Sequence, residues 1–196
     1  MNNAIRHLAF VVFGTVATAA VAAPANYEVD PEHTYPSFEA DHFGGVSVWR
    51  GKVKQSSGKI VLDRQAGTGS VDITMDMTTI DTGHEKLNGH LKGPDPGMLD
   101  VTKFPTAKYK GKLVNFKDGA PTQVQGELTL HGVTKPVTLT INSFKCMGHP
   151  MKMKEFCGAD AVATINREDF GVGWGKGFGF RMDVKIAIQI EAFAAS

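Results

Sequence analysis

The residues with the clearest chemical potential lie in one short segment that Cys146 and Cys157 enclose. Between these cysteines the chain reads Met-Gly-His-Pro-Met-Lys-Met-Lys-Glu-Phe, which fits no zinc-ligand spacing. Thiolates, thioethers and imidazole are ligands that suit Cu(I). If the cysteines are oxidised, the remaining ligand set is Met147, His149, Met151 and Met153. One interpretation is therefore a copper site. The other, which we favour, is an adaptable Met-rich apolar cap over a ligand tunnel.

A second candidate contact is Arg167, whose planar guanidinium suits an anionic or carbonyl head group. The alternative is an ion pair with Glu168 or Asp169 that holds a loop in place. The segment Gly171–Gly179 follows, with five glycines in nine residues, but it lacks the strand–helix context of a phosphate-binding loop. We expect instead a loop that gates one end of the domain.

The histidines do not form a recognisable catalytic motif. No Gly-x-Ser-x-Gly sequence or local nucleophile–base pair occurs, so we expect no enzymatic activity. His33 and His42 could lie together with Asp30 or Asp41 and bind a head group or a metal. The alternative is that each histidine has a structural role.

Residues 1–22 have the features of a secretory signal peptide in the expected order. Arg6 is followed by an apolar stretch over 8–16 and by Ala20-Val21-Ala22, which fits a cleavage site. We therefore predict a signal peptide over 1–22, one domain over 23–196, and export to the periplasm. Because export permits disulfides, we predict that Cys146 and Cys157 pair.

Composition narrows the class of protein further. The 196 residues include 21 Lys and Arg against 20 Asp and Glu, a net charge of +1, so nucleic-acid binding is not expected. The hydrophobic fraction of 42% is typical of a globular domain. No apolar run reaches the roughly 18 residues of a membrane-spanning helix, so the chain is not expected to span a membrane.

Strict alternation of apolar and polar residues predicts strands along most of the chain. The clearest examples are 183–193, 71–78 and 137–142. Gly126 interrupts one inner face and indicates a bulge or a close approach of strands. Over 82–92, Leu87 and Leu91 are spaced as in a short helix that the Pro- and Gly-rich 93–97 ends. The sequence thus predicts an all-β barrel or sandwich with one short helical crossover, whose interior is either filled or holds one apolar ligand.

Several stretches, in order along the chain, resemble the YceI family of secreted lipid-binding proteins. They are Val29-Asp-Pro-Glu-His-Thr34, Ser37-Phe38-x-x-x-His42-Phe43-Gly44, Thr79-Ile-Asp-Thr82, Lys103-Phe-Pro105, Gly126-Glu-Leu-Thr-Leu-His-Gly-Val-Thr-Lys-Pro-Val137 and Ile165-Asn-Arg-Glu-Asp-Phe-Gly171. The chain departs from the usual pattern at Met98-Leu99 and at Tyr35-Pro36, both expected near the tunnel mouth.

The resemblance implies a lipocalin-like, extended antiparallel β-barrel of about eight strands that holds a polyisoprenoid lipid, either an isoprenoid quinone or a polyprenyl chain. No other cofactor is implied. Transient docking at a membrane to load the lipid, and a homodimer, are further expectations. On this basis the expected ligand-binding residues are Phe38, His42, Phe43, Trp49, Ile73, Met75, Leu128, Leu139, Arg167, Phe170 and Ile188.

Overall fold

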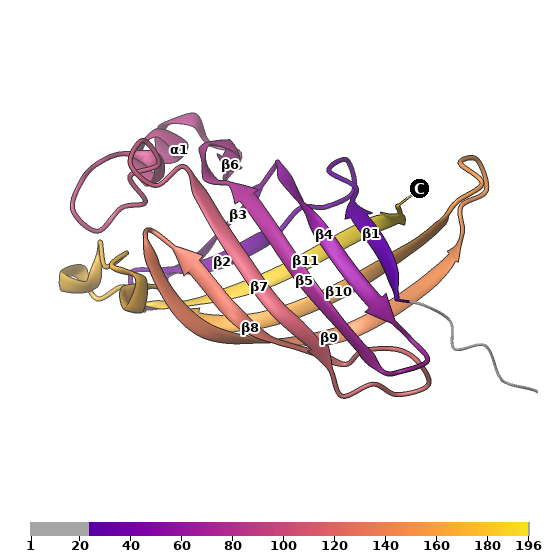
Figure 1. Cartoon of the computed structure of the whole chain (residues 1–196). Helices are drawn as coiled ribbons and strands as arrows, with labels where there is room; N and C mark the ends of the chain where they lie inside the picture. The colour runs from indigo at the N-terminus through magenta and orange to yellow at the C-terminus, as the bar shows by residue number, and fades with distance from the viewer. Residues whose placement is uncertain (1–23, 196) are drawn as a thin grey trace, which may run out of the picture.

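The computed structural model describes residues 24–195, so the predicted signal peptide lies outside the described residues. These residues form one long antiparallel sheet and a few short helices (Figure 1). The strands are β1 Ala25–Val29, β2 Ser37–His42, β3 Ser47–Val53, β4 Ser56–Asp63, β5 Thr68–Asp76, β6 Ile80–Asp81, β7 Thr106–Val114, β8 Gln123–Leu130, β9 Val133–Gly148, β10 Glu155–Asn166 and β11 Asp183–Ala194. The helices are α1 Glu85–Lys92 and the 3₁₀ turns η1 Met77–Thr79, η2 Arg167–Phe170 and η3 Lys176–Phe178.

The sheet closes into a barrel because β1 and β11, the first and last of eight consecutive strands, pair with each other. Eight strands follow one another in the order β1-β4-β5-β7-β8-β9-β10-β11, and β1 returns to pair with β11. The closing pairs join Tyr27 to Ala194 and Val29 to Ala192. At the other end of β11, β2 takes the place of β1, and the sheet continues into β3 and β6. The predicted antiparallel barrel of about eight strands with one helical crossover is confirmed.

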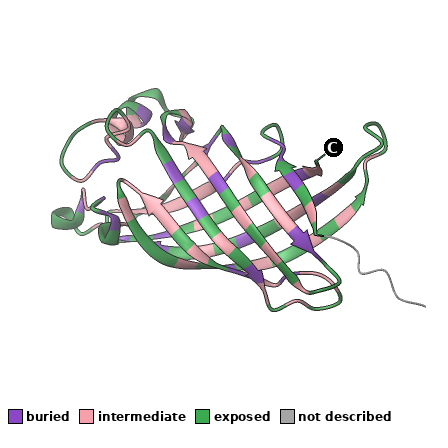
Figure 2. Cartoon of the chain, viewed as in Figure 1, coloured by how far each residue is buried: buried purple, intermediate pink, exposed green. Residues whose placement is uncertain are grey.

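The strands follow the alternation in the sequence. In β11, Val184, Ile186 and Ile188 face the interior, whereas Lys185 and Gln189 face solvent. Figure 2 shows the same alternation of burial along the other long strands. Strand β5 ends two residues earlier than the pattern over 71–78 predicts, because the Asp76 side chain accepts a hydrogen bond from the N–H of Thr78 and starts η1.

One predicted irregularity is a close approach of two strands. Gly126 on β8 lies opposite Gly111 on β7. A Cβ atom at residue 126 would lie 2.3 Å from the carbonyl oxygen of Lys110, so no larger residue fits without a shift of the backbone. The missing side chains let β7 and β8 approach at this point.

The short helix α1 lies across one end of the barrel (Figure 1). His84 caps it by accepting a hydrogen bond from the N–H of Leu87. The buried Asn88 fixes the helix to β6, since its amide donates to Asp81 and its carbonyl accepts from Thr82. Leu87 and Leu91 consequently face the barrel interior, as their spacing predicts. Within residues 24–195, no helix has the length and apolar character needed to cross a bilayer.

Candidate functional site

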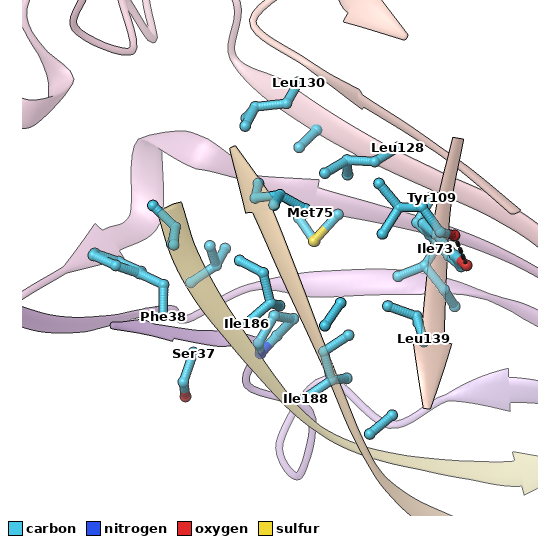
Figure 3. A pocket seen from close by; sticks show the side chains of 18 of the residues that line it. Ser37, Phe38, Ile73, Met75, Tyr109, Leu128, Leu130, Leu139, Ile186 and Ile188 are labelled. Atoms are coloured by element: carbon cyan, nitrogen blue, oxygen red, sulfur yellow. Dashed lines mark hydrogen bonds between the residues drawn. The ribbon is translucent and has the colours of Figure 1, made fainter. Parts of the chain in front are cut away.

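The barrel encloses an apolar cavity of about 400 Å³ that nearly every barrel strand helps to line. Figure 3 shows its wall, with Ile73 and Met75 from β5, Leu128 and Leu139 from β8 and β9, and Ile188 from β11. Because side chains on a strand alternate, each strand contributes every second residue to this wall. Most of the wall is built from aliphatic, methionine and small side chains, with aromatic rings among them.

The few polar groups deep in the cavity wall are already hydrogen-bonded. The hydroxyl of Tyr109 donates to the carbonyl oxygens of Val137 and Val124, at 2.9 and 3.2 Å. Burial raises the pKa of Tyr109 to about 12, so the phenol remains neutral. The buried hydroxyl of Thr34 bonds to the backbone of Glu191. A guest in this part of the cavity therefore meets an uncharged surface.

Charged and aromatic groups gather instead at the end of the cavity next to α1. Asp41, His42 and Arg167 line it there. Four aromatic side chains also line this mouth: Trp49, His90, Trp174 and Phe180. The rings touch one another, with centroids 4.8 Å apart for His42 and Trp49 and 5.6 Å apart for Trp174 and Phe180. The site thus has an apolar body and one polar mouth.

Arg167 is held at this mouth by backbone atoms. Its guanidinium donates to the carbonyl oxygens of Val172 and Trp174, both at 2.7 Å. Burial lowers the pKa of the guanidinium, and the Asp41 and Glu168 carboxylates oppose that shift. The predicted alternative of an ion pair with a neighbouring carboxylate is wrong, because Glu168 pairs with Lys176. Among the described residues, no carboxylate lies within 4.0 Å of the Arg167 side chain.

Nine of the eleven residues predicted to bind ligand line the cavity, and whether they contact a ligand remains a prediction. The other two, Phe43 and Phe170, do not line it. Phe170 ends η2 and is buried next to the cavity wall, packed in one cluster with Ile165 and Val184. Phe43 is half-exposed at the β2–β3 turn, where its backbone has a φ of 52°.

The histidines predicted to gather lie in separate surroundings. His33 Nδ1 is 2.8 Å from Asp30 Oδ2, and this hydrogen bond raises the pKa of His33. Glu191 completes a group whose ligand-type atoms lie within 4.8 Å of one another. His42 instead belongs to the aromatic cluster at the mouth and lies near the hydroxyl of Ser47. The prediction of one shared histidine site is therefore wrong.

The segment between the cysteines forms the turn of the long β9–β10 hairpin. Cys146 and Cys157 face each other across the strands and form the predicted disulfide. Met147, Met151 and Met153 are 44%, 84% and 96% exposed and do not line the cavity, so the prediction of an apolar cap over the tunnel is wrong.

His149 is fixed within the same turn. Its Nδ1 accepts hydrogen bonds from the N–H groups of Met151 and Lys152, and its ring packs against Phe156 and Phe193. That nitrogen is therefore engaged by the backbone. Copper binding by the methionines of this hairpin stays a prediction.

Residues from irregular segments complete the mouth, and the strand pattern does not reveal them. Trp174 and Phe180 come from the glycine-rich segment, and Met98 and Leu99 come from the loop after α1. None of these four follows a period of two or of 3.6 residues. The family resemblance placed Met98-Leu99 near the tunnel mouth, whereas aromatic character next to a run of glycines is the signal that points to Trp174 and Phe180.

A closed barrel with an apolar cavity and one polar mouth defines a class, the barrel binding proteins. Within it, this chain belongs to the YceI family: the family model described as a YceI-like domain matches residues 27–192. The chain is 31% identical to Protein YceI of Shigella flexneri over 173 residues, which cover 88% of each chain.

Solved structures show the same fold. BcnA of Burkholderia cenocepacia has a TM-score of 0.66 and 22% identity, covering 83% of this chain and 98% of its own. A polyisoprenoid binding domain from Saccharophagus degradans has a TM-score of 0.61 and 14% identity, covering 88% of this chain and all of its own.

The disulfide leads to a prediction about stability. Replacing both cysteines (Cys146→Ala/Cys157→Ala) should lower the free energy of unfolding by about 3 kcal/mol, because the unfolded chain regains the freedom of a loop of about 12 residues. Urea unfolding of the wild-type and the double variant measures this difference. Reduced wild-type protein should unfold at the same urea concentration as the double variant. An unchanged midpoint in both would show that the cross-link contributes nothing.

Proposed function

We propose that this protein is a periplasmic binding protein that holds a polyisoprenoid lipid, either an isoprenoid quinone or a polyprenyl chain, for storage or transport. The observation that carries the proposal is the long cavity inside the closed barrel, which is lined mainly by apolar side chains and has its charged groups at one mouth. The same fold in the polyisoprenoid binding domain from Saccharophagus degradans supports this ligand class. The signal-like segment at 1–22 supports the periplasm as its location.

The shape of the cavity favours an extended chain as its guest. Its wall on β11 runs from Val184 to Ala192, and eight steps at about 3.3 Å per residue give about 26 Å along that strand. Burial of apolar surface stabilises a complex by roughly 25 cal/mol per Å². A wall of aliphatic side chains with a few adaptable methionines suits a long hydrocarbon whose repeating units need no individual recognition.

A bound hydrocarbon would also affect the stability of the fold. A ligand that binds the folded barrel and not the unfolded chain stabilises the folded state by mass action. A carrier of this shape therefore gains stability from its cargo.

The polar mouth gives the bound lipid a direction. Arg167 and His42 line the cavity next to α1, whereas the wall toward the β9–β10 hairpin carries Phe144, Ile190 and other apolar residues. A lipid with a polar head would therefore place its head at the α1 end and its tail toward the hairpin. Arg167 still has unused N–H donors for such a head group.

Blocking the cavity tests the proposed function. Ala163 on β10 faces the cavity, and its neighbour Val162 faces outward. The variant Ala163→Trp should lower the affinity for a long-chain polyprenol at least tenfold, because the indole occupies the path of the tail. Uptake of radiolabelled polyprenol by delipidated protein measures this.

The matched control is Val162→Trp, which should bind like the wild-type protein. A thermal melt shows whether each variant is folded. If delipidated wild-type protein takes up neither polyprenol nor an isoprenoid quinone, the proposed function is wrong.

Arg167 generates a separate prediction about the head group. With polyprenyl phosphate as ligand, Arg167→Gln should weaken binding tenfold to a hundredfold, since charge-assisted hydrogen bonds contribute about 1.5–3 kcal/mol. Arg167→Lys should retain part of that affinity. Polyprenol with the same tail should bind the wild-type protein and both variants nearly equally. Equal losses for both lipids would show that Arg167 only supports the loop at Val172 and Trp174.

A further inference from the structure

The end of the barrel next to α1 carries four exposed apolar side chains. Phe43, Val46 and Val48 lie on or beside the β2–β3 turn and are 50%, 80% and 46% exposed. Phe178, in the glycine-rich segment, is 66% exposed. We refer to these four residues as the apolar rim. Of the large hydrophobic side chains that are exposed among residues 24–195, most of the others lie on the β9–β10 hairpin at the opposite end (Figure 1).

The two segments that form the apolar rim are fastened to each other. The backbone N–H of Arg181 donates to Asp41 at 2.9 Å, and its guanidinium donates to the carbonyl oxygen of Gly44 at 3.1 Å. The rings of Phe43 and Phe180 lie with their centroids 4.7 Å apart. Phe43 also keeps a positive φ, which is uncommon for a bulky residue and indicates that its neighbours hold it in place. The rim is therefore a built surface rather than two loose turns.

The apolar rim is continuous with the cavity. His42 and Phe180 line the cavity, and both rings contact Phe43 of the rim. Val48 precedes Trp49, which lines both the cavity and a shallow groove between β3 and α1. An apolar ligand that leaves the cavity at this end consequently emerges beside the rim.

We propose that the apolar rim inserts shallowly into the surface of a phospholipid bilayer and that the lipid passes there between membrane and barrel. This proposal rests on the proposed carrier function, since a carrier of polyisoprenoids must exchange its ligand with a membrane. It names the surface at which that exchange takes place.

The composition of this end fits a bilayer as the partner. Phenylalanine and tryptophan side chains at the end of a protein are suited to the boundary between head groups and acyl chains. The guanidinium of Arg181 stands beside the rim, and no carboxylate of the described residues lies within 4.0 Å of it. It is available for a lipid phosphate. A stable protein interface buries roughly 800 Å² per partner. Four side chains on two turns form a smaller surface than that, which favours a bilayer over a protein as the partner.

The experiment measures binding of the delipidated chain, residues 23–196, to vesicles of phosphatidylcholine with a minor fraction of phosphatidylglycerol. The test variant is Val46→Ser/Phe178→Ser, which alters the two most exposed rim residues and leaves the cavity wall intact. We expect the wild-type protein to sediment with the vesicles and the test variant to bind at least tenfold more weakly. The matched control, Met151→Ser/Met153→Ser, removes two even more exposed apolar side chains at the opposite end and should bind like the wild-type.

Uptake of polyprenol from detergent micelles separates this proposal from the proposed function. The test variant should take up polyprenol from micelles as the wild-type does and should take it up from vesicles more slowly. If the wild-type protein does not bind vesicles but takes up polyprenol from micelles normally, the docking proposal alone is overturned. Failure of wild-type uptake from micelles overturns the carrier function instead. The docking proposal is also overturned if the test variant binds vesicles as strongly as the wild-type protein. The same holds if the rim substitutions dissociate a dimer while neither the wild-type protein nor the variant binds vesicles.

Discussion

The interior wall of this barrel offers almost no hydrogen-bond partners, so the strands must satisfy their own backbone groups. A sheet with two free edges around an apolar cavity would leave rows of N–H and C=O groups next to it. Closure removes those edges, and it depends on β11, which pairs with β1 at one end and with β2 at the other. The position of the cavity, the alternation of the wall and the location of the mouth all follow from that closure.

The exchange of partners along β11 also explains why the two ends of the barrel differ. Where β1 completes the barrel, the ends of β9 and β10 are joined by a disulfide and extend into the exposed methionine hairpin. Where β2 completes it, β3, β6 and α1 follow, and the glycine-rich segment packs against the β2–β3 turn. The charged and polar side chains that line the cavity, Asp41, His42 and Arg167, therefore lie at the end next to α1, and a guest in the cavity experiences a polar and an apolar end.

Much of the barrel wall could be predicted from the sequence, because a strand that separates water from an apolar interior must alternate. Ile73, Met75, Leu128, Leu139 and Ile188 were identified in this way and line the cavity. The same rule does not apply to irregular segments, which is why Phe180 was not identified and Trp174 was not among the expected ligand-binding residues. The direction of a side chain in a turn depends on local φ and ψ and on tertiary contacts, which no periodic pattern records.

The aromatic and methionine predictions show that limit at particular residues. The positive φ of Phe43 places its ring half in solvent, and the 3₁₀ turn η2 buries Phe170 beside the cavity wall but not on its surface. The methionine hairpin was predicted to cover the tunnel, but it extends β9 and β10 beyond the barrel and leaves Met151 and Met153 exposed. Residue type indicated an apolar role in each case, whereas the geometry of the turn decided where the side chain lies.

The most direct test of the central claim is mass spectrometry of protein purified from its native cell envelope, recorded under native and then denaturing conditions. If the barrel is a polyisoprenoid carrier, the native mass should exceed the chain mass by that of one isoprenoid lipid, and the excess should vanish on denaturation. A native mass equal to that of the bare chain, combined with no isoprenoid lipid in an organic extract of the same sample, would contradict the account.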